Sequence, residues 1–157
     1  MLSQMSLFLR INEELRESMR KRDTTRTSAL RMLKSAIQYA GLEKGRAGEP
    51  SDPDVIAVIT KEIRKREDSI ARYRSGGRED LARQEESEIA VLRAYLPEPL
   101  SPEQLEELVR SAIRETGARS KAQLGAVIKA VLQQAGSRAD GRQVRDVAER
   151  FLETRGS

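Results

Sequence analysis

The residues best suited to chemistry in this sequence are cations at helical spacing. The run Lys61-Glu62-Ile63-Arg64-Lys65-Arg66 is strongly basic, and four residues fall near one face if it continues as a helix: Lys61, Lys65, Asp68 and Arg72. A charged helix face is usually solvated, which is the default interpretation. The alternative is a stripe that contacts phosphates and releases counterions from a nucleic acid backbone. No aromatic residues are interleaved with these cations, so base stacking is not predicted.

A second group of cations lies in the segment Gly136–Arg142. Gly136 is suited to end one helix in the left-handed conformation, and Asp140 is suited to cap the next. Neither task needs Arg138 or Arg142. These arginines either flank a turn or contact phosphate at a helix N-terminus, where free N–H groups assist a guanidinium but Asp140 opposes an anion.

Gly125 is unusual because it lies just inside a predicted helix, where glycine is about 1 kcal/mol less favourable than alanine. One interpretation is a tight crossing with another helix. The other is close approach of an RNA backbone or a partner, with Lys121 and Lys129 on either side.

Several kinds of catalytic site are excluded by composition. The chain has no cysteine and no histidine, which removes thiolate nucleophiles, histidine acid–base catalysis and most zinc sites. The glutamates at 85, 86 and 88 could in principle bind a hard cation, but they lack a loop of alternating oxygen ligands and are interpreted as helix surface. No phosphate-binding glycine motif is present. We therefore predict no catalytic residue, no metal and no cofactor.

The elements that must position these residues are predicted to be helices, because the 157-residue chain is 34% charged and only 3% aromatic. Apolar periodicity predicts a first helix over about Ser6 to Arg22, a second that fades at Gly41, a third capped by Asp52, and a fourth over about Arg78 to Tyr95. The middle of the fourth helix is expected to face solvent because of its glutamates. These four helices predict an N-terminal bundle.

Three prolines between Leu96 and Pro102 predict a domain boundary, with one domain at 1–97 and another at 98–157. Ser101 with Gln104 has the form of a capping box, and Ser120 with Gln123 repeats it. Together with a last apolar stripe that ends near Phe151, these signals predict a small three-helix domain. The fold class is thus all-α.

The net charge of +4 is compatible with RNA binding without establishing it. The N-terminal apolar run Leu7-Phe8-Leu9 is too short for a signal or membrane segment. We therefore expect a cytoplasmic protein that does not bind membranes. The oligomeric state does not follow from the sequence.

Six segments in this order resemble the YqeY family over nearly the whole chain: Arg26–Ile37, Lys61–Arg66, Gly77–Ala82, Tyr95–Pro97, Leu124–Lys129 and Arg138–Arg142. The resemblance implies a helical bundle followed by a three-helix domain similar to the tail of the B subunit of the glutamine-dependent aspartyl/glutamyl-tRNA amidotransferase. That tail contacts tRNA and does not perform amide transfer. The matching positions, implied as RNA-contact or supporting residues, are Gly125, Lys129, Arg138, Asp140, Gly141 and Arg142. Ala126 stands where the family often has a lysine, so one phosphate contact is missing.

The leading hypothesis is a non-catalytic accessory protein of tRNA metabolism, in which Lys129, Arg138, Arg142 and the cations Lys61, Lys65 and Arg72 neutralise phosphates. A second hypothesis is an adaptor that docks an amidotransferase or a synthetase. RNase treatment separates these two, since complexes bridged by RNA are lost on digestion. A third is a component of a carbon–nitrogen ligase with glutamine as amide donor, an activity associated with the family. We attribute that association to the enzyme that shares the tail, because releasing ammonia from glutamine requires a cysteine or serine nucleophile in an amidase.

Overall fold

The computed structural model describes residues 5–155, which form seven α-helices and no strand; the chain ends 1–4 and 156–157, included in the predicted domains, lie outside the described residues. The predicted all-α class is confirmed. The chain divides into two compact units, Met1–Leu96 and Pro97–Ser157. The predicted domain boundary, with one domain at 1–97 and another at 98–157, stays a prediction.

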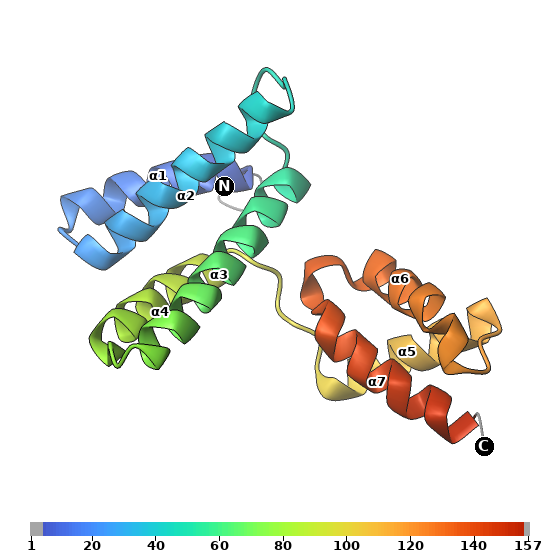
Figure 1. Cartoon of the computed structure of the whole chain (residues 1–157). Helices are drawn as coiled ribbons and strands as arrows, with labels where there is room; N and C mark the ends of the chain where they lie inside the picture. The colour runs from blue at the N-terminus through green and yellow to red at the C-terminus, as the bar shows by residue number, and fades with distance from the viewer. Residues whose placement is uncertain (1–4, 156–157) are drawn as a thin grey trace. The chain divides into compact units, whose positions relative to one another are not determined.

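The first two helices are α1 (Leu7–Arg20) and α2 (Thr24–Glu43), which pack side by side in opposite directions (Figure 1). The Oγ of Ser6 accepts a hydrogen bond from the N–H of Leu9, so α1 begins one residue later than predicted. Asp23 ends the connection and caps α2 by accepting from the N–H of Arg26 at 3.1 Å. The segment that breaks α1 therefore also starts α2.

The next pair is α3 (Asp52–Ser75) and α4 (Glu79–Arg93), again antiparallel neighbours (Figure 1). The predicted cap of α3 was wrong by one residue. Ser51 is the N-cap, and its Oγ accepts from the N–H of Asp54 at 3.3 Å. Asp52 instead accepts from the N–H of Leu7 at 2.9 Å, which joins the start of α3 to the start of α1.

The core of the first unit is built from the apolar stripes of all four helices. Its buried members include Ile11, Leu33, Ile59 and Leu92. The prediction that the middle of α4 faces solvent was wrong at Glu88, which is only 5% exposed. The buried carboxylate of Glu88 is compensated by an ion pair with Arg66.

The second unit contains α5 (Pro102–Thr116), α6 (Leu124–Ala135) and α7 (Gly141–Arg155), which pack around a common core (Figure 1). The predicted capping box of α5 is present: Ser101 Oγ accepts from the N–H of Gln104, and the Gln104 side chain accepts from the N–H of Ser101. Gly117 ends α5 with a φ of 67°, in the left-handed region that favours glycine.

The second predicted capping box, at Ser120, was wrong. The Ser120 side chain makes no capping hydrogen bond, and Lys121–Gln123 form a short 3₁₀ turn, η2, ahead of α6. The Gln123 side chain accepts from the N–H of Arg119 at 2.7 Å, so it stabilises the loop before α6 and does not complete a capping box.

Candidate functional site

The connection between α6 and α7 is a short turn in which Gly136 has an unusual backbone conformation. Its φ is 58°, as expected for a glycine, but its ψ of −129° lies outside the left-handed helical region that we predicted. Its N–H donates to the carbonyl of Leu132, and a 3₁₀ turn, η3 (Gly136–Arg138), follows. Glycine is favoured here because this region strains other L-residues.

Asp140 caps α7, as predicted. Its Oδ1 accepts from the N–H of Arg142 at 2.8 Å, and its carbonyl accepts from the N–H of Val144 at 3.0 Å. The carboxylate thus occupies the position where an external anion would meet the free N–H groups of the helix. Contact with phosphate in this region therefore depends on the guanidinium groups.

Arg138 is exposed and holds the start of the second unit. Its Nε–H donates to the carbonyl of Glu98 at 3.2 Å, and its own carbonyl accepts from the N–H of Leu100 at 2.9 Å. These bonds fix the turn to the proline-rich segment. Within the part of the chain that the structure describes, no carboxylate neutralises Arg138.

Arg142 and Lys129 are exposed, and their side chains have no ion-pair partner among residues 5–153. Other cations of this unit do form ion pairs. Lys121 lies 2.5 Å from Glu153, whose hydrogen bond and charge raise the pKa of Lys121, and Arg145 lies 3.9 Å from Glu149. The cations predicted to bind phosphate are therefore available, while several neighbours are paired.

Gly125 lies in the first turn of α6 and is exposed. A Cβ added there would meet no heavy atom within 4 Å, so the predicted tight crossing with another helix was wrong. Gly141 is also open, and its φ is not positive. The packing that the structure describes requires glycine at neither position.

The cations of α3 belong to the first unit. Lys61, Lys65 and Arg72 are all exposed, as the helical spacing predicts. Lys65 is partly neutralised by Glu62 at 3.5 Å, whereas Lys61 and Arg72 have no carboxylate partner among the described residues. The sequence-predicted residues thus lie on the outer face of α3, within α6 at Gly125 and Lys129, and at the α6–α7 turn with Arg138 and Arg142.

Arg66 lies in the same basic run but is buried, which the sequence analysis missed. Its Nη1 lies 2.7 Å from Glu88 and 3.0 Å from Glu85, both on α4. The helical spacing could have indicated this burial, since Arg66 falls between Ile63 and Ile70 on the apolar stripe of α3. Two of the glutamates considered as cation ligands therefore bind an arginine.

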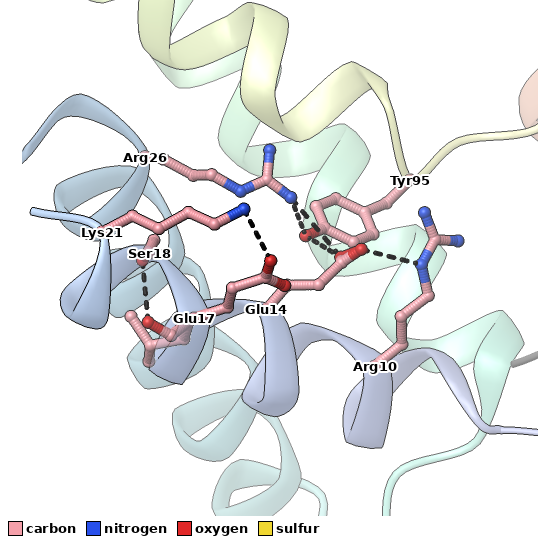
Figure 2. A network of polar contacts seen from close by, with 8 residues as sticks. Arg10, Glu14, Glu17, Ser18, Lys21, Arg26 and Tyr95 are labelled. Carbon is pink, nitrogen blue, oxygen red and sulfur yellow. Dashed lines mark hydrogen bonds and ion pairs between the residues drawn. The ribbon is translucent and has the colours of Figure 1, made fainter. Parts of the chain in front are cut away.

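A second missed cluster joins α1, α2 and the end of α4 (Figure 2). The O–H of Tyr95 donates to Glu14 at 2.5 Å, and Arg26 donates to the Tyr95 oxygen at 3.1 Å. Arg10 lies 3.4 Å from Glu14, with its guanidinium 4.9 Å from the centre of the Tyr95 ring. Burial and the hydrogen bond to Glu14 raise the pKa of Tyr95 well above its usual range. This tyrosine is held protonated and is suited to anchoring the chain.

The same helix pair carries two further polar contacts. Ser18 and Thr27 hydroxyls lie 2.8 Å apart, and Lys21 lies 2.8 Å from Glu17 (Figure 2). The hydrogen bond from Lys21 lowers the pKa of Glu17. These contacts tie the turn between α1 and α2.

Within residues 5–155, no helix is long and apolar enough to span a membrane. The same part of the chain brings together no group of three or more Asp, Glu, His or Cys residues that could hold a metal ion.

A groove of about 890 Å³ lies between the end of α2, the following loop and the start of α3. Phe8, Ile37 and Val58 supply apolar surface, and Lys61 lies at its edge. Lys44 and Arg46 at the groove are paired with Asp54, whereas Lys61 and Glu43, which also line it, have no ion-pair partner among the described residues.

A family model described as Yqey-like protein matches residues 8–152, which cover both units. The chain belongs to the YqeY family.

Curated relatives of this YqeY family member come from fungi. An uncharacterized protein of Schizosaccharomyces pombe is 40% identical over 91 residues, covering 58% of this chain and 72% of that protein. Proteins named Altered inheritance of mitochondria protein 41, mitochondrial, are 29% identical over 117 residues in Pyrenophora tritici-repentis and 26% identical over 109 residues in Vanderwaltozyma polyspora. These matches cover 71% and 68% of this chain but only 62% and 58% of those two proteins.

The missed cluster draws on two of the segments that carry the YqeY resemblance. Arg26 begins the first of them and Tyr95 begins the fourth, and they meet at one hydrogen bond although 69 positions separate them in sequence. In this YqeY family member the end of the first unit is thus tied to the start of α2.

Proposed function

We propose that this YqeY family member is a non-catalytic tRNA-binding accessory protein. One observation carries the proposal: Lys129, Arg138 and Arg142 are exposed and lack carboxylate partners among the described residues. Such cations keep their full charge for a polyanion, whereas a paired cation must first give up its partner.

The chemistry available to the chain supports a binding role. It has neither cysteine nor histidine, so it lacks a thiolate nucleophile and a histidine base for releasing ammonia from glutamine. Tyr95 and Glu14 form a half-buried acid–acceptor pair, but Arg10 and Arg26 engage the carboxylate and the raised pKa keeps the phenol protonated. Both groups serve the fold in this arrangement.

Binding would act mainly through phosphates. Each guanidinium or ammonium that contacts a phosphate releases condensed counterions, so affinity falls steeply with salt. The open position at Gly125 lets an RNA backbone come close to α6, with Lys129 one helical turn away. The exposed α3 cations Lys61 and Arg72 form a second basic surface for the same polyanion.

The test is a titration of the full chain with tRNA at several salt concentrations. The double variant Arg138→Glu/Arg142→Glu is expected to weaken binding at least tenfold at low salt. The matched control is Arg110→Glu/Arg114→Glu, because it also reverses two charges in the same unit, on exposed residues that already have a carboxylate partner, Glu107 at 3.7 and 3.6 Å. Equal losses in the two proteins, or no salt-dependent binding of the wild-type chain, would overturn the proposal.

The proposed function includes the cellular compartment in which the protein acts. We propose a cytoplasmic location, and the mitochondrial names of two relatives make the mitochondrion the competing one. Cell fractionation followed by immunoblotting decides between them.

A further inference from the structure

The second unit begins with a short segment, residues 97–100, whose backbone is constrained by two prolines. Pro97 and Pro99 are exposed and flank Glu98. Proline fixes its own φ and restricts the preceding residue to extended conformations, so the carbonyl of Glu98 has few directions open to it. Leu100 closes the segment by packing its side chain against the core of the second unit.

This segment and Arg138 are joined by two hydrogen bonds. The Nε–H of Arg138 donates to the carbonyl of Glu98 at 3.2 Å, and the N–H of Leu100 donates to the carbonyl of Arg138 at 2.9 Å. Both the backbone and the guanidinium of one arginine are thus attached to the same short piece of chain. The bond to Glu98 joins residues 40 positions apart, so it forms only when the second unit folds.

The acceptor on Glu98 is a backbone carbonyl, which has no net charge. A carboxylate would orient a guanidinium and also neutralise it, as Glu107 does for Arg110 at 3.7 Å. A carbonyl orients the guanidinium and leaves its charge uncompensated. The carboxylate of Glu98 forms no ion pair with any of the residues that the structure describes. Arg138 is therefore both oriented and available to an anion.

The bond to Glu98 leaves one edge of the Arg138 guanidinium open. The five N–H groups of an arginine lie in one plane, with one on Nε and two on each Nη. The two Nη groups of Arg138 have no hydrogen-bond or ion-pair partner among residues 5–153, and the residue is exposed. Their outer edge presents two parallel N–H bonds, which is the geometry that binds two oxygens of one phosphate.

We propose that residues 97–100 position Arg138 to bind one RNA phosphate through both of its Nη groups. The inference rests on the proposed function and adds which arginine recognises the phosphate and which backbone orients it. The Arg142 side chain is the contrast, because it makes no contact with a described residue that would orient it. Immobilising a long side chain opposes binding, and an arginine that is held beforehand avoids much of this loss.

The test is a titration of the full chain with tRNA at several salt concentrations. Pro99→Gly leaves every cation in place but frees the backbone of Glu98, so we expect the affinity to fall about fivefold. The slope of log affinity against log salt should not change, whereas Arg138→Gln should lower it by about 0.9. Pro102→Gly is the matched control and is expected to bind like the wild type, because Pro102 is an exposed proline in the first turn of α5.

Three further variants connect the loss of affinity to Arg138. In the Arg138→Gln background, Pro99→Gly should cause no additional loss, because no guanidinium remains to be oriented. Lysine keeps the charge but lacks the planar edge, so Arg138→Lys is expected to weaken binding about fivefold and Arg142→Lys to bind like the wild type. Glu98→Ala keeps the backbone carbonyl and is expected to bind at least as tightly as the wild type.

The outcomes separate this inference from the proposed function. A wild-type chain without salt-dependent tRNA binding overturns both. If the wild type binds and Pro99→Gly binds equally well, or loses as much affinity with Gln at position 138 as with Arg, the positioning of Arg138 is overturned and the proposed function stands. Circular dichroism of each variant is expected to match the wild type, because Pro99 is exposed and Leu100 still packs against the core.

Discussion

Arginines play opposite parts in the two units of this chain. In the first unit, Arg66 is buried and Arg26 is half-buried, and each reaches carboxylates or a phenol of a distant helix. In the second unit, Arg138 and Arg142 are exposed around the α6–α7 turn and meet no carboxylate among the described residues. The same residue type therefore holds the fold together in one place and remains available for a ligand in the other.

Burial explains the difference. A charge removed from water is strongly destabilising unless the chain supplies an opposite charge and hydrogen bonds. Arg66 satisfies this condition through Glu85 and Glu88, and Arg26 through Glu14 and Tyr95. An exposed arginine keeps its hydration and needs no partner, so its charge remains available to another molecule.

The largest expected effect is at Arg66. We expect Arg66→Met to lower the free energy of unfolding by about 3 kcal/mol, because Glu88 stays buried without its partner. Urea unfolding followed by tyrosine fluorescence measures this, and it reports the first unit because Tyr39, Tyr73 and Tyr95 all lie there.

The double variant Arg66→Met/Glu88→Leu is the control for that experiment. It removes both charges, so we expect it to recover most of the loss. If Arg66→Met alone costs less than about 1 kcal/mol, the contrast between the units does not rest on this buried pair.

The next effect is at Tyr95. We expect Tyr95→Phe to lower the free energy of unfolding by about 2 kcal/mol, because it removes the hydrogen bonds to Glu14 and Arg26 while keeping the ring. The same urea experiment measures it with the two remaining tyrosines. Tyr73→Phe is the control, since no hydrogen bond of the Tyr73 hydroxyl is found among the described residues.

The stability of the wild type should also depend on alkaline pH through Tyr95. Burial and the bond to Glu14 raise the pKa of Tyr95 in the folded state, so the unfolded chain releases this proton first, near the ordinary tyrosine pKa of about 10. The contribution is complete below pH 10 and is lost as the pH rises above it. We expect the difference between wild type and Tyr95→Phe to shrink by about 1.4 kcal/mol between pH 9 and pH 11. A constant difference over this range would contradict the assignment.

Gly125→Ala tests the second unit, where we expect residues that bind a ligand without stabilising the fold. We expect this substitution to stabilise α6 by about 0.5 kcal/mol, because the position is helical and open. Amide hydrogen exchange in α6 measures the gain. Weaker tRNA binding by the stabilised variant would indicate close approach of RNA at this position, and unchanged binding would place the RNA elsewhere.

The smallest effect on stability is expected from Lys129→Gln/Arg142→Gln. Neither side chain has a partner among the described residues, so the free energy of unfolding should change by less than about 0.5 kcal/mol. The slope of log affinity for tRNA against log salt should nevertheless fall by about 1.8. A large loss of stability with an unchanged salt slope would mean that these cations stabilise the fold and do not contact tRNA, which would contradict the contrast between the two units.

The local features of the fold were predicted best from the sequence. The all-α class, the caps at Ser101 and Asp140 and the exposure of the α3 cations were correctly predicted, because each depends on residues a few positions apart. It failed at Ser51, which replaces Asp52 as the cap of α3, and at Ser120, which caps nothing with its side chain. At α3, Ser51 and Asp52 are both suitable caps, and Asp52 instead accepts from the N–H of Leu7, which is distant in sequence. At Ser120, a 3₁₀ turn of Lys121–Gln123 precedes α6.

The candidate site was predicted only in part. Helical spacing correctly placed Lys61, Lys65 and Arg72 on one exposed face, but it did not separate Arg66 from them, because Glu88 and Glu85 come from another helix. The crossing expected at Gly125 was wrong for the same reason. Whether a second helix passes over a glycine is a property of three-dimensional packing.

The sequence by itself determined the helices of this YqeY family member, the caps at Ser101 and Asp140 and the absence of histidine and cysteine chemistry. These follow from periodicity, from hydrogen bonds within one turn and from composition. Only the tertiary structure decided which cations are paired and which remain available. The bond between Tyr95 and Glu14 joins residues 81 positions apart, and the pair of Arg66 and Glu88 joins residues 22 positions apart. The energy of such contacts depends on burial, and burial exists only once the helices have packed.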